Sequence, residues 1–97
     1  MTEDQLFNAG VDAVLVEGFE DDLPFVANRC VKNGIAVHID KPGGHDLSEF
    51  TDMLKAAKQH QIPVQMAYMY RYNPAVLDCL QKVREGRLER FTVHTAL

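Results

Sequence analysis

The sequence predicts an α/β fold, with a parallel sheet that is followed by an antiparallel strand. Three short apolar runs at 11–18, 35–39 and 64–70 alternate with segments of helical spacing, which predicts a βαβαβα unit. The final run at 91–97 instead alternates apolar and polar side chains, as an antiparallel strand with one solvated face does.

The first strand and helix have clear local signals. The run at 11–18 is continuously apolar, which is typical of a strand covered on both faces. Asp22 as N-cap, Pro24 in the first turn and Gly34 as the stop delimit the helix that follows. Its predicted apolar face consists of Leu23, Val26, Ala27, Cys30 and Val31.

The second helix is predicted to begin after Asp46. Glu49 lies three residues later, which is the spacing of a capping box, and the helix should reach about His60 because Pro63 bars continuation. Its predicted buried stripe consists of Leu47, Phe50, Leu54 and Ala57.

The third helix repeats this pattern, with Asn73 as N-cap, Pro74 as first helical residue and Gly86 as stop. Its predicted inward residues are Val76, Leu77, Leu80 and Val83. Strand and helix thus alternate three times, which favours right-handed crossovers and a parallel sheet.

Composition is that of a small globular protein of 97 residues, 46% of them hydrophobic and 25% charged. The net charge is −4 and there is no basic stripe, so the chain lacks the electrostatic footprint of nucleic-acid binding. No apolar run approaches the roughly 20 residues of a membrane span. The acidic N-terminus is unlike a signal peptide, so a cytoplasmic location is the default expectation.

The cysteines and histidines predict no special chemistry. Cys30 and Cys79 each fall on the apolar face of a helical pattern, so we expect two buried free thiols in a reducing compartment. The best candidate metal ligands are His38, Asp40 and His45, whose spacing matches neither CxxC nor HExxH. We therefore expect no metal site.

Asp40, Lys41 and Pro42 follow the second strand, where open parallel sheets bind their ligands. The Lys41 ammonium group could donate hydrogen bonds to a hydroxyl or carbonyl group. Partial burial would favour the neutral amine and suit it to proton transfer. The alternative is a solvated lysine in a glycine-containing loop.

A second polar cluster follows the third strand and is expected at the same edge of the sheet. It consists of Tyr68, Tyr70, Arg71 and Tyr72. Aromatic walls with one guanidinium group suit a polyhydroxylated or carboxylated small molecule. The alternative is that these tyrosines form the amphipathic edge of a core.

The motif "GIAVHIDKP" followed by "YMYRYNP" resembles the pair of motifs in the Gfo/Idh/MocA oxidoreductases, relatives of glucose-fructose oxidoreductase and inositol dehydrogenase. The resemblance covers nearly the whole chain. It implies that Lys41 is catalytic and approaches both nicotinamide ribose and substrate. The implied cofactor-binding residues are Gly18, Phe19, Asp40, Lys41 and Pro42, and the implied substrate-binding residues are Tyr68, Arg71 and Tyr72.

The resemblance also implies the function and the domains. The fold would be a partial Rossmann-type parallel sheet that ends in the first antiparallel strand of a second α/β domain. Hydride would pass between NAD or NADP and a sugar, inositol or similar hydroxyl compound, in an enzyme expected to be a homo-oligomer. Residues 1–86 would be the C-terminal half of a dinucleotide-binding domain, and 87–97 the first strand of the substrate domain. The chain would then be an internal fragment, inactive alone.

The chain departs from the family pattern at three places. Asp40 stands where the family usually has Glu, and "GFEDDL" stands where it has Thr-Pro-Asn, with Leu23 at the position of a nearby His. No GxGxxG turn follows a strand. The alternative function is a non-catalytic, truncated α/β module that binds or assembles. In either case the first strand is expected to be an exposed edge that causes dimerisation, aggregation or a partly molten state.

Overall fold

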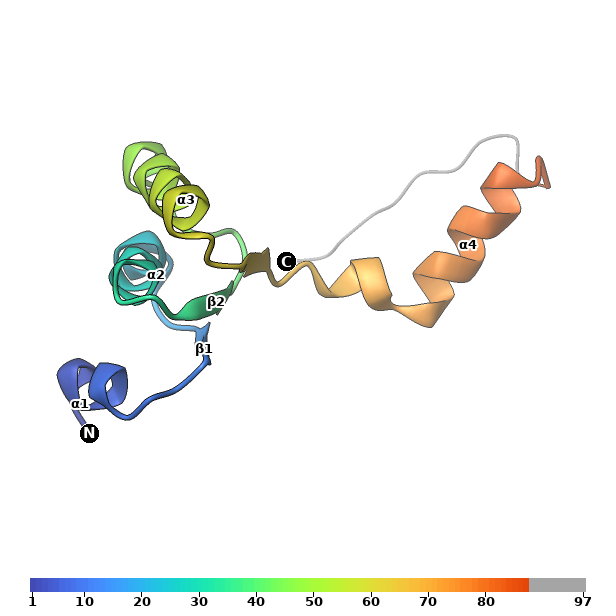
Figure 1. Ribbon diagram of the computed structural model, residues 1–97. Helices are drawn as coiled ribbons and strands as arrows, with labels where there is room; N and C mark the ends of the chain where they lie inside the picture. Colours follow the sequence, from blue (N-terminus) through green and yellow to red (C-terminus); the bar gives the residue numbers. More distant parts are fainter. Residues whose placement is uncertain (88–97) are drawn as a thin grey trace. The chain divides into compact units, whose positions relative to one another are not determined.

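The computed structural model describes residues 1–87 of the chain (Figure 1). The predicted antiparallel strand at 91–97 lies outside the described residues, and so does nearly all of the predicted second domain at 87–97. The chain divides into two compact units, Met1–Ala67 and Tyr68–Leu97, and each is described by itself.

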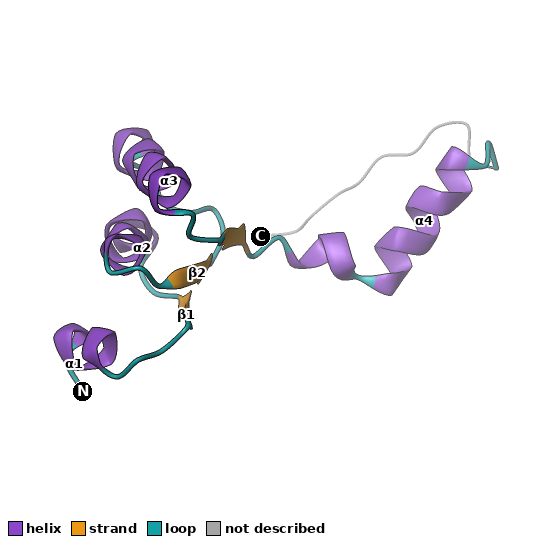
Figure 2. Ribbon diagram, viewed as in Figure 1, coloured by secondary structure: helices purple, strands orange, loops and turns teal. Residues whose placement is uncertain are grey.

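The first unit contains a parallel sheet in the order β1-β2-β3, formed by β1 (Ala13–Val16), β2 (Ala36–Ile39) and β3 (Val64–Met66). The register pairs Val14 with Val37, and Val37 with Val64. Helices alternate with the strands, as the secondary-structure colours of Figure 2 show. The predicted parallel α/β fold is therefore confirmed for this part of the chain.

Helices α2 (Leu23–Lys32) and α3 (Leu47–His60) lie on one face of the sheet (Figure 1). Successive right-handed crossovers that step in one direction put both helices on the same side. The expectation that the first strand is covered on both faces is therefore wrong within Met1–Ala67: Val16 is buried but Leu15 is 78% exposed. The buried core consists of Val16, Leu23, Ala27, Cys30, Val31, Ile35, Val37, Ile39, Met53 and Ala57.

Helix α1 (Glu3–Asn8) was not predicted, although the sequence carries a signal for it. The hydroxyl of Thr2 accepts a hydrogen bond from the Gln5 amide at 3.2 Å, and the Thr2 amide donates to the Gln5 side chain at 2.8 Å. This is a complete capping box. Arg29 on α2 forms an ion pair with Glu3 at 2.7 Å, and this hydrogen bond lowers the pKa of the Glu3 carboxyl.

The predicted cap of α3 is confirmed in one of its two halves. Asp46 Oδ1 accepts a hydrogen bond from the Glu49 amide at 2.8 Å. The Glu49 carboxylate, which a capping box would direct back to the Asp46 amide, instead accepts a hydrogen bond from Asn28 at 2.7 Å. A buried polar group on α2 therefore competes for the side chain that would complete the box.

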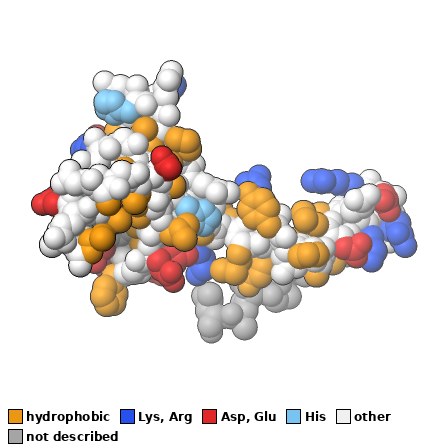
Figure 3. Space-filling model, turned by 60° about the horizontal axis from the view of Figure 1, so that its bottom comes forward, with side chains coloured by type: hydrophobic (Ala, Val, Ile, Leu, Met, Phe, Trp, Pro, Cys, Tyr) orange, Lys and Arg blue, Asp and Glu red, His pale blue; other side chains and the backbone are white. Residues whose placement is uncertain are grey.

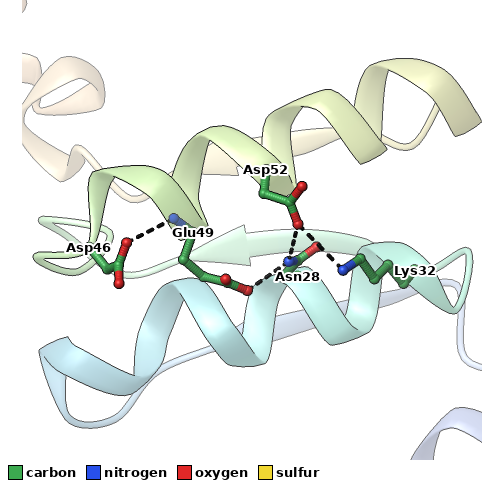
Figure 4. A network of polar contacts seen from close by, with 5 residues as sticks. All are labelled: Asn28, Lys32, Asp46, Glu49 and Asp52. Carbon is green, nitrogen blue, oxygen red and sulfur yellow. Dashed lines mark hydrogen bonds and ion pairs between the residues drawn. The ribbon is translucent and has the colours of Figure 1, made fainter.

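Asn28 joins α2 to α3 through a polar network, which Figure 4 shows. Its side chain is 3% exposed, and Nδ2 also donates to Asp52 Oδ2 at 3.0 Å. Lys32 Nζ lies 3.4 Å from the same oxygen. The hydrogen bond from Asn28 and, to a smaller extent, that from Lys32 lower the pKa of the Asp52 carboxyl. Both hydrogens of the buried amide thus bind carboxylates, whereas Asn28 Oδ1 has no partner among the described residues.

The buried stripe of α3 differs from the prediction. Met53 and Ala57 are buried and Phe50 packs against the core, but Leu47 is 77% exposed and Leu54 is also exposed. The face that meets α2 is therefore displaced around the helix axis from the predicted stripe. The predicted face of α2, in contrast, is confirmed, because its residues all belong to the core or pack against it.

Strand β3 ends at Met66, four residues before the predicted end at 70. Its partner β2 ends at Ile39, where the chain turns away. Residues after Ala67 therefore have no neighbouring strand with which to form backbone hydrogen bonds. In the second unit, Met69–Tyr72 form a 3₁₀ turn, η2, instead of a strand end. The prediction that the tyrosine cluster lies at the end of a strand is therefore wrong, because the cluster lies in and directly before this turn.

Helix α4 (Pro74–Arg84) has the predicted ends, because Asn73 Oδ1 accepts from the Ala75 amide at 2.9 Å and Gly86 follows at a φ of +72°. Of its predicted inward residues, Val76, Leu80 and Val83 are half-buried and Leu77 is exposed, and none of the helix's residues is fully buried. Beside α4 the described part of this unit has only η2, which is too small to enclose an apolar stripe. Cys79 is accordingly exposed, contrary to expectation, while Cys30 is buried. Among the described helices, none combines the length and apolar content that crossing a bilayer requires.

Candidate functional site

The carboxyl ends of the strands form one edge of the first unit. The Asp40 amide donates to the Val16 carbonyl at 2.9 Å, and the Ala67 amide donates to the Ile39 carbonyl at 2.9 Å. Each chain exit is thus bonded to the end of the neighbouring strand. We call the two segments 17–20 and 40–45, which follow β1 and β2, the rim.

The second rim segment begins with a tight turn. Asp40 is half-buried, its Oδ1 accepts a hydrogen bond from the Lys41 amide at 2.8 Å, and its carbonyl accepts from the Gly43 amide at 3.0 Å. The peptide bond between Lys41 and Pro42 is cis. The turn fixes the backbone of Lys41, but the side chain is exposed, so the partial burial expected for it is not found in Met1–Ala67.

Gly43 and Gly44 allow this loop to pack closely, with φ values of +87° and +98°. A Cβ atom on Gly43 would lie 2.9 Å from Met66 Cε. A Cβ atom on Gly44 would lie 2.7 Å from Pro24 Cγ, in the first turn of α2. Side chains are excluded here by both backbone conformation and space. The two glycines therefore hold the rim against α2 and β3.

A histidine and a glutamate, both exposed, join the two rim segments. His45 Nε2 lies 2.8 Å from Glu20 Oε2, in the 3₁₀ turn η1 (Glu20–Asp22). The sequence indicated His45 only as a candidate metal ligand. No local sequence pattern predicts a contact between two residues that are 25 positions apart. In residues 1–87 no group of three or more His, Cys, Asp or Glu could hold a metal ion.

Gly18 and Phe19 lie in the first rim segment and are exposed, Phe19 to 84%. The Phe19 carbonyl accepts from the Asp22 amide at 2.9 Å, which starts η1. A shallow depression lies beside this turn and is lined by Asp21, Phe25, His45, Asp46 and Leu47. The residues expected to contact a cofactor thus all lie on the rim of one unit.

The residues expected to bind substrate lie in the second unit. Tyr68, Arg71 and Tyr72 lie in or directly before η2, where the Arg71 amide donates to the Tyr68 carbonyl at 3.0 Å. All three side chains are exposed. One turn therefore brings a guanidinium group and two phenols together.

Comparison with known proteins gives matches by structure. No protein-family model and no curated protein matches the sequence. The chain matches myo-inositol 2-dehydrogenase from Lactobacillus plantarum with a TM-score of 0.82 and 22% identity, covering 92% of this chain and 27% of that protein. It matches scyllo-inositol dehydrogenase from Lactobacillus casei, solved with NAD(H) and scyllo-inositol, with a TM-score of 0.79 and 22% identity, covering 90% and 26%.

These matches confirm the parallel, Rossmann-like part of the fold that the resemblance to the Gfo/Idh/MocA oxidoreductases implies. The chain spans about a quarter of the length of the inositol dehydrogenases it matches, so it corresponds to one part of such a protein. At these identities the likeness establishes the fold alone.

Proposed function

We propose that this chain forms part of the nicotinamide-binding domain of an oxidoreductase acting on a sugar, inositol or similar hydroxyl compound. One observation carries the proposal: Asp40, Lys41 and Pro42 directly follow the central strand of a parallel sheet whose fold matches inositol dehydrogenases. Ligands of such sheets bind beyond the carboxyl ends of the strands.

The rim residues would bind the cofactor and assist proton transfer. Gly18, Phe19 and Asp40 to Pro42 would contact NAD or NADP, which when bound supplies the acceptor for hydride. During alcohol oxidation the hydroxyl group must also lose its proton. Lys41 would assist that proton transfer by hydrogen-bonding the hydroxyl oxygen, while the two electrons of the C–H bond leave with the hydride. The exposed position of Lys41 leaves its ammonium group accessible to a ligand.

The turn η2 would supply substrate contacts. The Arg71 guanidinium donates only, whereas the phenols of Tyr68 and Tyr72 both donate and accept, which suits a polyol. In the same proposal residues 1–86 are half of a dinucleotide-binding domain and 87–97 begin a substrate domain.

NADH binding to the 97-residue chain tests this proposal. We expect a dissociation constant on the order of 1 mM, because the chain has no glycine-rich pyrophosphate turn. Lys41→Ala should weaken binding about tenfold, as loss of a charge-assisted hydrogen bond would. Saturation-transfer NMR with NADH measures both.

Lys58→Ala is the matched control, because Lys58 is exposed in the last turn of α3, remote from the rim along that helix. It should bind NADH as the unchanged chain does. Equal losses in both variants, or no saturation transfer to NADH in the unchanged chain, would refute the proposal.

A further inference from the structure

The contact between His45 and Glu20 lies in the loops beyond the sheet, outside the core. The distance from Nε2 to Oε2 is 2.8 Å, and the side chains are 63% and 53% exposed. Histidine side chains, coloured pale blue, reach the molecular surface in the view of Figure 3. Exposed ion pairs add little to the overall stability of a protein. The position of this pair, more than its contribution to stability, therefore points to its role.

The two rim segments are joined at both of their ends. Where they leave the strands, the Asp40 amide donates a hydrogen bond to the Val16 carbonyl at 2.9 Å. Where they approach the helices, His45 contacts Glu20. The other residues proposed to contact the cofactor lie between these two bonds along the chain, and they are Gly18, Phe19, Lys41 and Pro42. The pair therefore closes the end of the rim that the sheet does not hold.

The backbone holds both partners of this pair in place. Glu20 is the first residue of the turn η1. Gly44, directly before His45, packs so closely that a Cβ atom on it would lie 2.7 Å from Pro24 Cγ and 3.0 Å from the Glu20 carbonyl oxygen. Asp46, directly after His45, is the N-cap of α3. Little backbone freedom is therefore lost when the two side chains meet.

We propose that His45 and Glu20 are positioning residues, whose contact holds the Lys41 turn beside the first rim segment in the arrangement that binds the nicotinamide cofactor. This inference rests on the proposed function. Neither side chain touches the cofactor in this account, and both act through the backbone of the two loops. Loops that are already held lose less conformational entropy when a ligand binds, so the pair raises the affinity.

NADH affinity measured by saturation-transfer NMR tests the proposal. His45→Ala should weaken binding about threefold, which is the scale of an exposed ion pair. In a Glu20→Ala background the same substitution should cause no further loss, because its partner is already absent. His45→Gln keeps a side-chain N–H group that can donate to Glu20, so it should retain most of the affinity.

His60→Ala is the matched control, because His60 is exposed in the last turn of α3 and should bind NADH as the unchanged chain does. A loss from His45→Ala that is equal in both backgrounds would overturn the inference, since His45 would then act without Glu20. Equal weakening by His45→Ala and His45→Gln would overturn it as well.

Amide hydrogen exchange in the absence of cofactor separates this inference from the proposed function. The Gly43 amide donates to the Asp40 carbonyl at 3.0 Å and closes the Lys41 turn. His45→Ala should raise its exchange rate about threefold and leave the amides of α2 unchanged. If His45→Ala changes neither this rate nor NADH affinity, the inference alone fails. If the unchanged chain does not bind NADH, the proposed function fails, and the positioning role fails with it.

Discussion

Asn28→Asp should lower the free energy of unfolding by about 3 kcal/mol or more at pH 7. Asn28 is 3% exposed and its Nδ2 donates to two carboxylates, at 2.7 and 3.0 Å. The substitution replaces a donor by a third negative charge without a partner, in a buried site. Urea unfolding followed by circular dichroism measures the loss.

Asn28→Leu separates the charge from the lost hydrogen bonds. It removes the Asn28 donor from Glu49 and Asp52, but Glu49 is only half-buried and exposed Asp52 keeps Lys32 at 3.4 Å, so water can replace the lost donor and we expect a change within about 1 kcal/mol. The introduced carboxyl of Asn28→Asp should have a pKa raised by burial and by like charges. Its destabilisation should therefore be full above that raised pKa and vanish as the pH falls toward about 4. A deficit independent of pH would show that charge is not the cause.

Gly44→Ala should lower the free energy of unfolding by about 3 kcal/mol, from a strained backbone and from overpacking together. The φ of Gly44 is +98°, and the added methyl group would overlap the ring of Pro24 and approach the Glu20 carbonyl at 3.0 Å. The loop must then leave α2, which also moves Lys41. Thermal unfolding of the variant gives the effect.

Gly34→Ala is the control for backbone strain alone, because Gly34 has a φ of +75° but a Cβ atom there meets nothing within 4 Å. We expect a loss of only about 1 kcal/mol. If both substitutions cost the same, close packing of the rim against α2 contributes nothing to stability.

Local sequence signals were sufficient for the alternation of strands and helices and for the caps at Asp46 and Asn73. Such signals act within a few residues, and the physics they report is local. The exposure of Leu47 and the burial of Met53 depend on how α3 lies against α2. The spacing of apolar residues along α3 does not show this. The redirection of Glu49 to Asn28 is equally non-local.

The candidate site could be predicted in part for the same reason. In a parallel sheet all carboxyl ends share one edge, so the sequence alone is enough to place Gly18, Phe19 and Asp40 together. The pair of His45 and Glu20 could not be predicted, because it joins a loop to a turn 25 residues earlier. The sequence pattern around Arg71 predicts a strand end where the chain forms a turn. Strand β3 ends early because its partner β2 ends at Ile39, and the sequence of β3 does not show where its partner ends.

Residue-resolved NMR during a titration with NADH tests the central claim most directly. We predict changes in the amide chemical shifts of Gly18, Phe19 and residues 40–44. We predict none at Asn33 or Gln61, which precede β2 and β3 and so lie at the amino-terminal ends of the strands, opposite the rim. Shifts at that opposite edge, or no shifts at all, would contradict the assignment of the rim as a nicotinamide-binding site.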